Sequence, residues 1–277
     1  MKTLVCLAAC LASTLPGWSK EPLQPGIKAD IEYARAGDAS LTLDAFVPEG
    51  TGPFATCILV HGGGFTKGTK QSFIKPLFEP LSKAGFTWFT INYRLAPQHR
   101  WPACSDDVRS AVKWVKDHAA EYKVDTQRIA LIGESAGGHL VSWAGVHASG
   151  DETVAAVVPF YAPHDLTIQV RKRNGLGNLA DLTGLTELNE AAWKTLADIS
   201  PASHIRGGLP PFLLIHGDKD ETVPHEQSTL FQASMLKAGN VCDLITIPGG
   251  GHGMGGWDKL GSGYQTQLIN WLHKTLK

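Results

Sequence analysis

Apolar residues along the chain gather into short runs that have the spacing of β-strands. Two runs, 28–34 and 41–47, alternate apolar and polar residues with a period of two, which predicts an antiparallel pair with one solvated face. The run 54–60 is continuously apolar, as expected for a strand that is covered on both faces. Further strands are predicted over 86–91, 128–132, 154–160, 211–216 and 241–247.

Between these runs, apolar positions recur with the spacing of helices. The longest such stretch follows Pro102, and its predicted buried positions are Val108, Ala111, Val112 and Val115. Further helices are predicted over 72–84, 224–238 and 258–275. Strands that alternate with helices indicate an α/β domain with a mostly parallel sheet and helices on both of its faces.

Residues 162–208 interrupt this alternation between two predicted strands. The segment contains Pro163, a basic trio at 171–173, several glycines and a helix-like piece around 187–197. Long connections in compact domains usually carry function, so we expect a small lid or a substrate-binding insertion here. Residues 20–277 otherwise show no internal repeat or linker, which favours one domain.

Residues 1–19 have the pattern of a signal peptide. Lys2 precedes an apolar stretch over 4–12 that is too short to span a membrane, and a helix break and small residues suited to cleavage follow it. The pattern predicts a secreted or periplasmic protein. The alternatives are a short N-terminal helix and a lipoprotein anchor at Cys10, which ends a Leu-Ala-Ala-Cys box.

The charge balance argues against some partners. Lys and Arg number 25 and Asp and Glu number 26, so the net charge of −1 provides no electrostatic drive toward nucleic acid or anionic membranes. No apolar run approaches the roughly 18 residues that indicate a membrane-spanning helix.

The spacing of cysteines and histidines predicts no cofactor. Beyond the predicted signal peptide, Cys57, Cys104 and Cys242 remain, and three thiols allow one disulfide bridge but require none. No histidine pair or Cys-x-x-Cys has the spacing of metal ligands, so no metal is expected.

The strongest chemical motif is Gly-Glu-Ser-Ala-Gly over 133–137. It follows the predicted strand that ends at Ile132 and opens a helix-like run, so the chain must turn sharply at Ser135. Such a turn exposes the hydroxyl at a helix N-terminus, where negative charge is stabilised. We predict that Ser135 is a nucleophile for acyl transfer, and the alternative is a glycine-rich turn with an N-capping serine.

A second glycine run, His-Gly-Gly-Gly over 61–64, directly follows a predicted strand. Its glycines let the backbone turn N–H groups toward a developing oxyanion. The predicted donors are Gly63, Gly64 and Ala136, and Gly62 is an alternative for one of them. The histidine that begins the run is expected to brace the loop. A phosphate-binding loop is disfavoured because no Gly-Lys-Ser/Thr follows.

Acyl transfer also needs a base, and position favours His252 among the 11 histidines. His252 lies late in the chain, in a glycine-rich loop that follows a predicted strand and is able to reach Ser135. Structural roles are expected for His139 and His216, and surface or capping roles for His99, His118, His147 and His273. Substrate contact is left open for His164, His204 and His225.

The carboxylate that orients the base is predicted to be Asp220. Two aspartates, Asp218 and Asp220, follow the predicted strand at 211–216, and Asp220 lies three residues before Val223, where the next helix is about to begin. The intervening turn directs Asp220 back toward the site. Asp218 is expected to bond the backbone of its own turn.

The chain order Ser135, Asp220, His252 is that of the α/β-hydrolases, which this chain resembles. The chain is also similar to hormone-sensitive-lipase-like and feruloyl or acetylxylan esterase-like carboxylesterases. The motifs at 61–64 and 133–139 and Tyr-Arg-Leu-Ala-Pro at 93–97 carry this narrower resemblance. The resemblance spans nearly the whole chain after the predicted signal peptide. It implies an α/β-hydrolase fold, the same triad and oxyanion hole, and a structural role for the acid at position 107 (Asp107), which braces loops. The absence of a large N-terminal cap favours the compact carbohydrate-esterase type.

The expected function is hydrolysis of short-acyl or carbohydrate-linked (acetyl or feruloyl) esters by a secreted serine carboxylesterase. Its substrate is a small-molecule or polysaccharide-linked ester, and the oligomeric state stays open. Trp101, Trp193 and Trp257 are candidate walls of the pocket, whereas Trp114 and Trp143 are expected in the core. The alternatives are a serine peptidase of the prolyl-oligopeptidase type, although this chain has no propeller domain, and a non-catalytic ligand-binding homologue.

Overall fold

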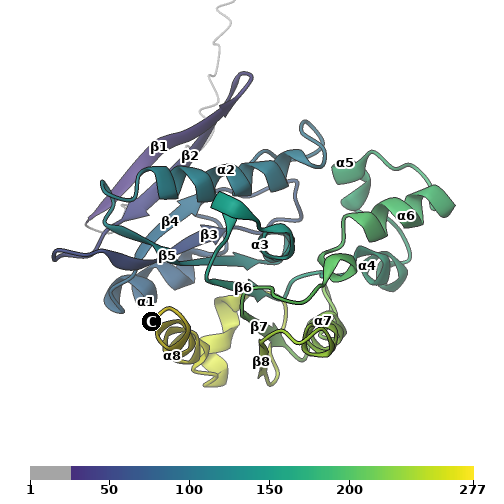
Figure 1. Ribbon diagram of the computed structural model, residues 1–277. Helices are drawn as coiled ribbons and strands as arrows, with labels where there is room; N and C mark the ends of the chain where they lie inside the picture. The colour runs from purple at the N-terminus through teal and green to yellow at the C-terminus, as the bar shows by residue number, and fades with distance from the viewer. Residues whose placement is uncertain (1–25) are drawn as a thin grey trace, which may run out of the picture.

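The computed structural model describes residues 26–277, which form an eight-stranded sheet with helices around it (Figure 1). The strand order is β1-β2-β4-β3-β5-β6-β7-β8. β1 pairs antiparallel with β2 and β2 with β4, and all the other neighbours are parallel. The strands are β1 (Ile27–Ala36), β2 (Ala39–Phe46), β3 (Phe54–Val60), β4 (Thr87–Ile91), β5 (Val124–Glu134), β6 (Ala156–Phe160), β7 (Phe212–Gly217) and β8 (Cys242–Ile247).

Each apolar run that predicts a strand is a strand in the structure. The largest difference is β5, which begins at Val124 rather than near Arg128 and continues to Glu134. The predicted signal peptide and the lipoprotein alternative at Cys10 lie outside the described residues.

Helices cover both faces of the sheet (Figure 1). One layer contains α2 (Ala103–Asp117), α3 (Ala136–His147) and α7 (Glu226–Lys237), and the other contains α1 (Phe78–Lys83) and α8 (Tyr264–Thr275). In β3, Ile58 and Val60 pack into the core of the first layer, while Cys57 and Leu59 pack into the core of the second. Successive side chains of a strand point to opposite faces, which explains why this strand is apolar throughout.

Two helices are shorter than the sequence pattern predicts. The segment 72–84 forms a 3-10 turn, η1 (Lys75–Leu77), and only then α1, because Pro76 and Pro80 lack the N–H groups that a continuous helix needs. The segment 258–275 is helical only from Tyr264. Gly261 and Gly263 have φ angles of 63° and 55°, which end η4 (Met254–Leu260) before α8 begins.

The segment 162–208 is built from short helices that lie beside one end of the sheet (Figure 1). They are α4 (Leu166–Arg173), α5 (Leu179–Thr183), α6 (Glu190–Asp198) and the 3-10 turn η3 (Pro201–His204). Only α6 was predictable from its apolar spacing, since α4 and α5 are too short to show a period. Leu166, Leu179 and Leu196 are buried in the core of the first layer, so the segment is packed onto the domain.

The three cysteines in the described part of the chain are buried and free of disulfide bonds. Burial raises the pKa of Cys104 and of Cys242 to about 12, so neither thiol is ionised near neutral pH. The alternative of a bridge among Cys57, Cys104 and Cys242 is therefore wrong for this structure.

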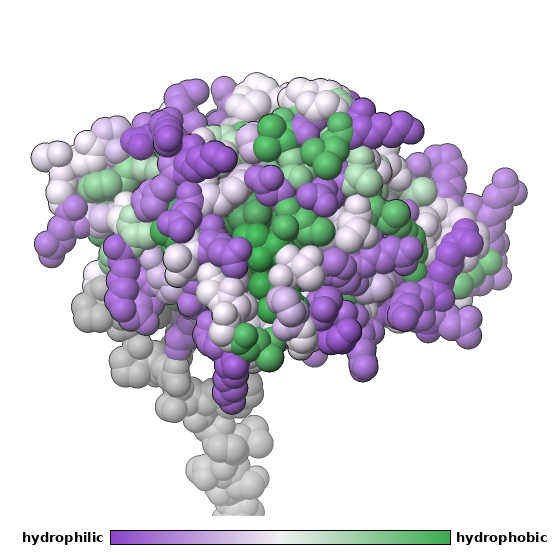
Figure 2. Space-filling view, turned by 90° about the horizontal axis from the view of Figure 1, so that it is seen from below, coloured by the Kyte–Doolittle hydropathy of each residue, from purple (hydrophilic) through white to green (hydrophobic). Residues whose placement is uncertain are grey.

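One of the two edge strands of the sheet is β8, which lies between α7 and α8 (Figure 1). Asp243 and Thr246 are exposed there, and Leu244 and Ile245 are half-buried. Figure 2 shows the molecule from below, and the face turned to the viewer has apolar side chains near its middle and mostly polar ones around them. Within residues 26–277, no helix has both the length and the apolar character that a membrane crossing requires.

Candidate active site

Ser135 joins β5 to α3 in a strained turn. Its φ of 53° and ψ of −116° lie where residues with a side chain are rarely found. The neighbouring glycines are needed for close approach: a Cβ on Gly133 would lie 2.3 Å from the oxygen of Gly137, and one on Gly137 would lie 2.2 Å from the oxygen of Val60. The turn therefore leaves the Ser135 hydroxyl at the N-terminus of α3.

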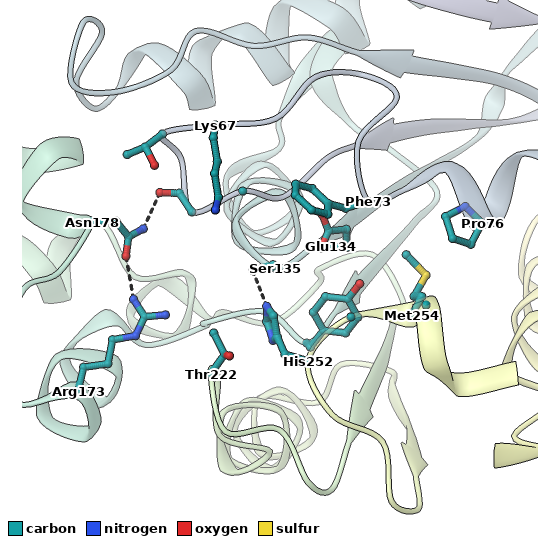
Figure 3. Close-up of a pocket in the computed structure, with 16 residues that line it drawn as sticks. Lys67, Phe73, Pro76, Glu134, Ser135, Arg173, Asn178, Thr222, His252 and Met254 are labelled. Atoms are coloured by element: carbon teal, nitrogen blue, oxygen red, sulfur yellow. Dashed lines mark hydrogen bonds between the residues drawn. The ribbon is translucent and has the colours of Figure 1, made fainter. Parts of the chain in front are cut away.

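The structure brings Ser135, His252 and Asp220 together. The Ser135 hydroxyl lies 3.0 Å from Nε2 of His252, as the dashed line in Figure 3 shows. Nδ1 of His252 lies 2.7 Å from Oδ2 of Asp220. With a proton on Nδ1, the imidazole donates to Asp220 and accepts from Ser135, which is the arrangement that deprotonates a serine.

The Asp220 carboxylate is fixed from several directions. Its Oδ1 accepts the N–H groups of Thr222 and Val223 at 2.8 and 2.9 Å. Burial alone raises the pKa of Asp220, but hydrogen bonds from His216 and His252 outweigh it and hold the pKa well below its ordinary value. Asp220 is therefore ionised and able to stabilise a protonated His252.

The predicted role of Asp218 is wrong. Its Oδ1 accepts the N–H of Gly249 at 2.8 Å, across the gap to the loop that carries His252. The turn's own backbone is bonded by Asp220 instead. Asp218 thus connects the loop that carries Asp220 to the loop that carries His252.

The loop after β3 presents unpaired backbone donors beside Ser135. Gly63 and Gly64 have φ angles of 100° and 63°, which favour glycine. Within the described residues, the N–H groups of Gly63, Gly64 and Ala136 have no hydrogen-bond acceptor. Gly62 is different, because its N–H donates to the carboxylate of Glu134. The predicted donors Gly63, Gly64 and Ala136 thus have N–H groups available for an oxyanion, whereas the N–H of the alternative, Gly62, is already bonded.

The sequence pattern does not single out Glu134, which the structure places in the lining of the cavity beside Ser135. It is 3% exposed, and its carboxylate accepts the N–H of Gly62. Burial raises the pKa of Glu134 to about 7. The available signal was its place directly before Ser135, since an acid at the end of a buried strand needs a partner.

A cavity of about 680 Å³ opens beside Ser135 and His252 (Figure 3). Lys67, Asn178, Arg173 and Thr222 line one side of it, and Phe73, Pro76 and Met254 line the other. Among the lining residues, Tyr161 is 1% exposed, and its hydroxyl interacts with the buried carboxyl of Glu134.

A second, much smaller cavity of about 20 Å³ also adjoins Ser135. It is lined by Gly64 and Ala136, so it lies beside the unpaired donors. Its apolar walls are Phe65, Pro163, Leu166, Leu179 and Val223, and the polar residues Gln169, Arg173 and Asn178 line it as well. The volume holds about one water-sized group.

The predicted tryptophan walls of the pocket are wrong. Trp101, Trp193 and Trp257 do not line the large cavity, whose aromatic lining comes from Phe73 and Tyr161. Trp257 is buried, and its Nε1 donates to the carbonyl of Gly251, so it supports the loop of His252 from behind.

The other histidines have structural contacts. His61 stacks on Tyr93 with the ring centroids 4.3 Å apart, and Nε2 of His216 lies 3.0 Å from the carbonyl of Val223. The histidines left open for substrate contact do not line either cavity: His164 stacks on Phe231, His204 bonds the carbonyl of Asp198, and His225 bonds Thr246. The rings of His204 and His225 are thus hydrogen-bonded within the protein, whereas both ring nitrogens of His164 are buried without a hydrogen-bond partner among residues 26–277.

Two further expectations concern loop bracing and metal binding. Asp107 pairs with Arg94, with 2.6 Å between Oδ1 and Nη2, and also accepts the Arg94 backbone N–H, which confirms its structural role. Within residues 26–277, no group of three or more His, Cys, Asp or Glu residues is arranged to hold a metal ion.

Among protein families, the BD-FAE profile matches residues 43–235 of the chain. The probable carboxylic ester hydrolase LipM of Mycobacterium tuberculosis is 34% identical over 192 residues, which cover 65% of this chain and 44% of that protein. An acetylxylan esterase of Xylanibacter ruminicola is 27% identical over 240 residues, covering 85% of this chain and 48% of that protein. The chain spans about half the length of the curated relatives it matches.

Solved esterase structures are similar over most of the chain. A truncated carbohydrate esterase from gut microbiota has a TM-score of 0.78 and 29% identity, and the match covers 91% of this chain and 99% of that one. Esterase 2 of Thermogutta terrifontis, phosphorylated by paraoxon, has a TM-score of 0.74 and 28% identity, with 90% and 94% of the two chains covered. These matches confirm the predicted α/β-hydrolase fold.

The buried carboxyl of Glu134 predicts how stability depends on pH. A carboxyl whose pKa is raised on folding binds its proton more tightly in the folded chain, so stability falls as pH rises from about 4.5 to about 7. Glu134→Gln removes this contribution. We expect the Tm of the variant, measured by calorimetry, to rise relative to the Tm of the wild type when the pH is raised from 5 to 8. A Tm difference that is the same at both pH values contradicts the assignment.

Proposed function

This chain belongs to the BD-FAE family of α/β-hydrolase esterases, and on that premise we propose that it is a serine carboxylesterase that removes short acyl groups from carbohydrates. One observation carries the proposal. The hydrogen-bonded series Ser135–His252–Asp220 ends beside unpaired N–H groups, at the junction of a small cavity and a large one.

In the first half of the proposed reaction, Oγ of Ser135 attacks the ester carbonyl carbon and its proton moves to Nε2 of His252. The carbonyl oxygen becomes an oxyanion that accepts hydrogen bonds from Gly63, Gly64 and Ala136. The ionised carboxylate of Asp220 stabilises the imidazolium. When the tetrahedral intermediate collapses, the carbon–oxygen bond to the alcohol breaks and His252 gives its proton to the departing alkoxide.

In the second half, a water molecule attacks the acyl-enzyme. His252 takes the proton of the water, and the same N–H groups bind the second oxyanion. Cleavage of the bond to Oγ releases the carboxylic acid, and the proton on His252 returns to Ser135. The cycle consumes one ester and one water and needs no metal or redox cofactor for its balance.

The size of the smaller cavity supports a short acyl group. It touches Ser135 and the donors Gly64 and Ala136, and its volume of about 20 Å³ holds about one methyl-sized group. An acetyl ester places only a methyl group there. A feruloyl group would have to occupy the larger cavity, so the geometry favours acetyl over feruloyl esters.

The larger cavity then receives the alcohol part of the ester. Its volume of about 680 Å³ and its polar side suit a sugar unit or a longer carbohydrate. A carbohydrate esterase and an acetylxylan esterase among the similar proteins support this choice. The predicted export of the chain agrees with a polymer substrate outside the cytoplasm, so we also propose that the protein is secreted or periplasmic.

The nucleophile is tested by Ser135→Ala. We expect hydrolysis of 4-nitrophenyl acetate to fall by roughly a million-fold, because loss of a triad serine removes nearly all covalent catalysis. A fluorophosphonate probe should label the wild type at Ser135, and the related esterase that is phosphorylated by paraoxon supports this expectation. Ser203→Ala, an exposed serine of η3, is the matched control and should be labelled like the wild type. Retained labelling of Ser135→Ala would exclude Ser135 as the nucleophile.

The acyl cavity is tested by Leu179→Ala. Leu179 lines the small cavity from α5, so the shorter side chain makes room for a longer acyl group. We expect the ratio of kcat/KM for butyryl over acetyl 4-nitrophenyl esters to rise by roughly tenfold, the usual effect of one or more methylene groups in a pocket. Leu182→Ala truncates another buried leucine of α5 that does not line either cavity, and it should leave the ratio unchanged. Equal changes in both variants would count against the assigned acyl site.

A further inference from the structure

Two positively charged side chains reach the large cavity from different elements. Lys67 comes from the loop that also carries Gly63 and Gly64, and Arg173 comes from the last turn of α4. In Figure 3 the ammonium group of Lys67 points into the cavity above Ser135, and the guanidinium of Arg173 enters the same side of the cavity from below. Like charges on one wall repel each other unless an anion lies between them.

No acidic side chain neutralises either cation by a direct contact. Within residues 26–277, the side chain of Lys67 has neither an ion pair nor a hydrogen bond, in contrast to Arg94 with its bidentate Asp107. Arg173 donates only to the amide oxygen of Asn178, at 2.8 Å, which is a neutral acceptor.

The acids near the cavity are engaged elsewhere. Glu134 is buried and bonded to Gly62, and Asp220 is bonded to His252 and to its own turn. Their charges act on the rim only from a distance. A cleft lined by one sign of charge concentrates ions of the opposite sign.

Arg173 is also held in place by a polar relay. Nη1 of Arg173 donates to Asn178, whose Nδ2 donates to the carbonyl of Gly64 at 2.5 Å (Figure 3). The guanidinium is therefore oriented before any ligand arrives, and its remaining N–H groups are available. A planar guanidinium with free donors matches the geometry of a carboxylate.

We infer that Lys67 and Arg173 form a subsite for a carboxylate on the alcohol part of the substrate, so that the preferred esters are acetylated acidic sugars. This inference rests on the proposed esterase function. It also rests on the assignment of the large cavity to the alcohol: both cations line that cavity, and Arg173 lines the small cavity as well.

The test compares two substrates that differ only at the sugar's sixth carbon. One is an acetylated methyl glucuronoside, which carries a carboxylate there, and the other is the equally acetylated methyl glucoside, which carries a hydroxymethyl group. We expect kcat/KM to be about tenfold higher for the glucuronoside at low ionic strength, as for a charge-assisted hydrogen bond. The preference should shrink in 0.5 M salt, where the Debye length is only about 4 Å, because both cations are exposed and therefore screened.

Variants assign the preference to these two residues. Lys67→Met keeps the length of the side chain and removes its charge, and it should lower the glucuronoside-to-glucoside ratio several-fold, as should Arg173→Gln. Lys67→Arg keeps the charge and should restore the preference. Lys172→Met is the matched control, because Lys172 is an exposed cation of α4 that does not line the cavity. It should leave the ratio at the wild-type value.

The outcomes separate this inference from the proposed function. If the wild type hydrolyses 4-nitrophenyl acetate but treats the two sugars alike, the anion subsite is wrong and the esterase function stands. The subsite is also wrong if Lys67→Met and Lys172→Met change the ratio equally. If the wild type hydrolyses none of the three esters, the esterase function fails and the subsite fails with it. A stronger preference for an acetylated glucoside 6-phosphate than for the glucuronoside would overturn the choice of a carboxylate in favour of phosphate.

Discussion

The close approach of the chain to itself at Ser135 is the contact on which the rest of the site depends. A Cβ on Gly137 would lie 2.2 Å from the oxygen of Val60 and 2.5 Å from that of His61. This contact holds the start of α3 against the loop after β3, so Ser135 keeps a fixed separation from Gly63 and Gly64. The positive φ of Ser135 is a strain that the surrounding packed β5 and α3 must hold in place.

Glu134 joins the same two elements by a hydrogen bond to Gly62. A Cβ on Gly62 would lie 2.2 Å from a carboxylate oxygen of Glu134, so a side chain there would displace the carboxylate. The bond occupies the N–H of Gly62 and leaves those of Gly63 and Gly64 free for the oxyanion. Burial of an ionisable carboxyl destabilises the fold, and such groups gather at sites where function requires them. Glu134 thus determines which N–H groups of the loop after β3 stay unpaired beside Ser135.

The sequence predicts the parts of this site that depend on chain order and strand ends. Ser135, Asp220 and His252 follow β5, β7 and β8, and parallel strands bring their carboxyl ends to one edge of the sheet. Tyr161 and Asn178 were missed because their importance comes from contacts between distant segments. The tryptophan prediction failed for a related reason: a composition rich in Trp does not reveal which side of a loop each ring occupies, and Trp257 lies behind the His252 loop.

The segment 162–208 illustrates why a long insertion need not be a moving lid. Leu166 and Leu179 are buried in the main core and at the same time form walls of the small cavity beside Ser135. Asn178, between α4 and α5, donates from its Nδ2 to the carbonyl of Gly64. A Cβ on Gly64 would lie 2.8 Å from the same Nδ2 atom. Opening the segment as a unit would expose those leucines and break that bond. The insertion is therefore better described as a fixed wall, and substitutions in it should alter substrate choice and the oxyanion loop together.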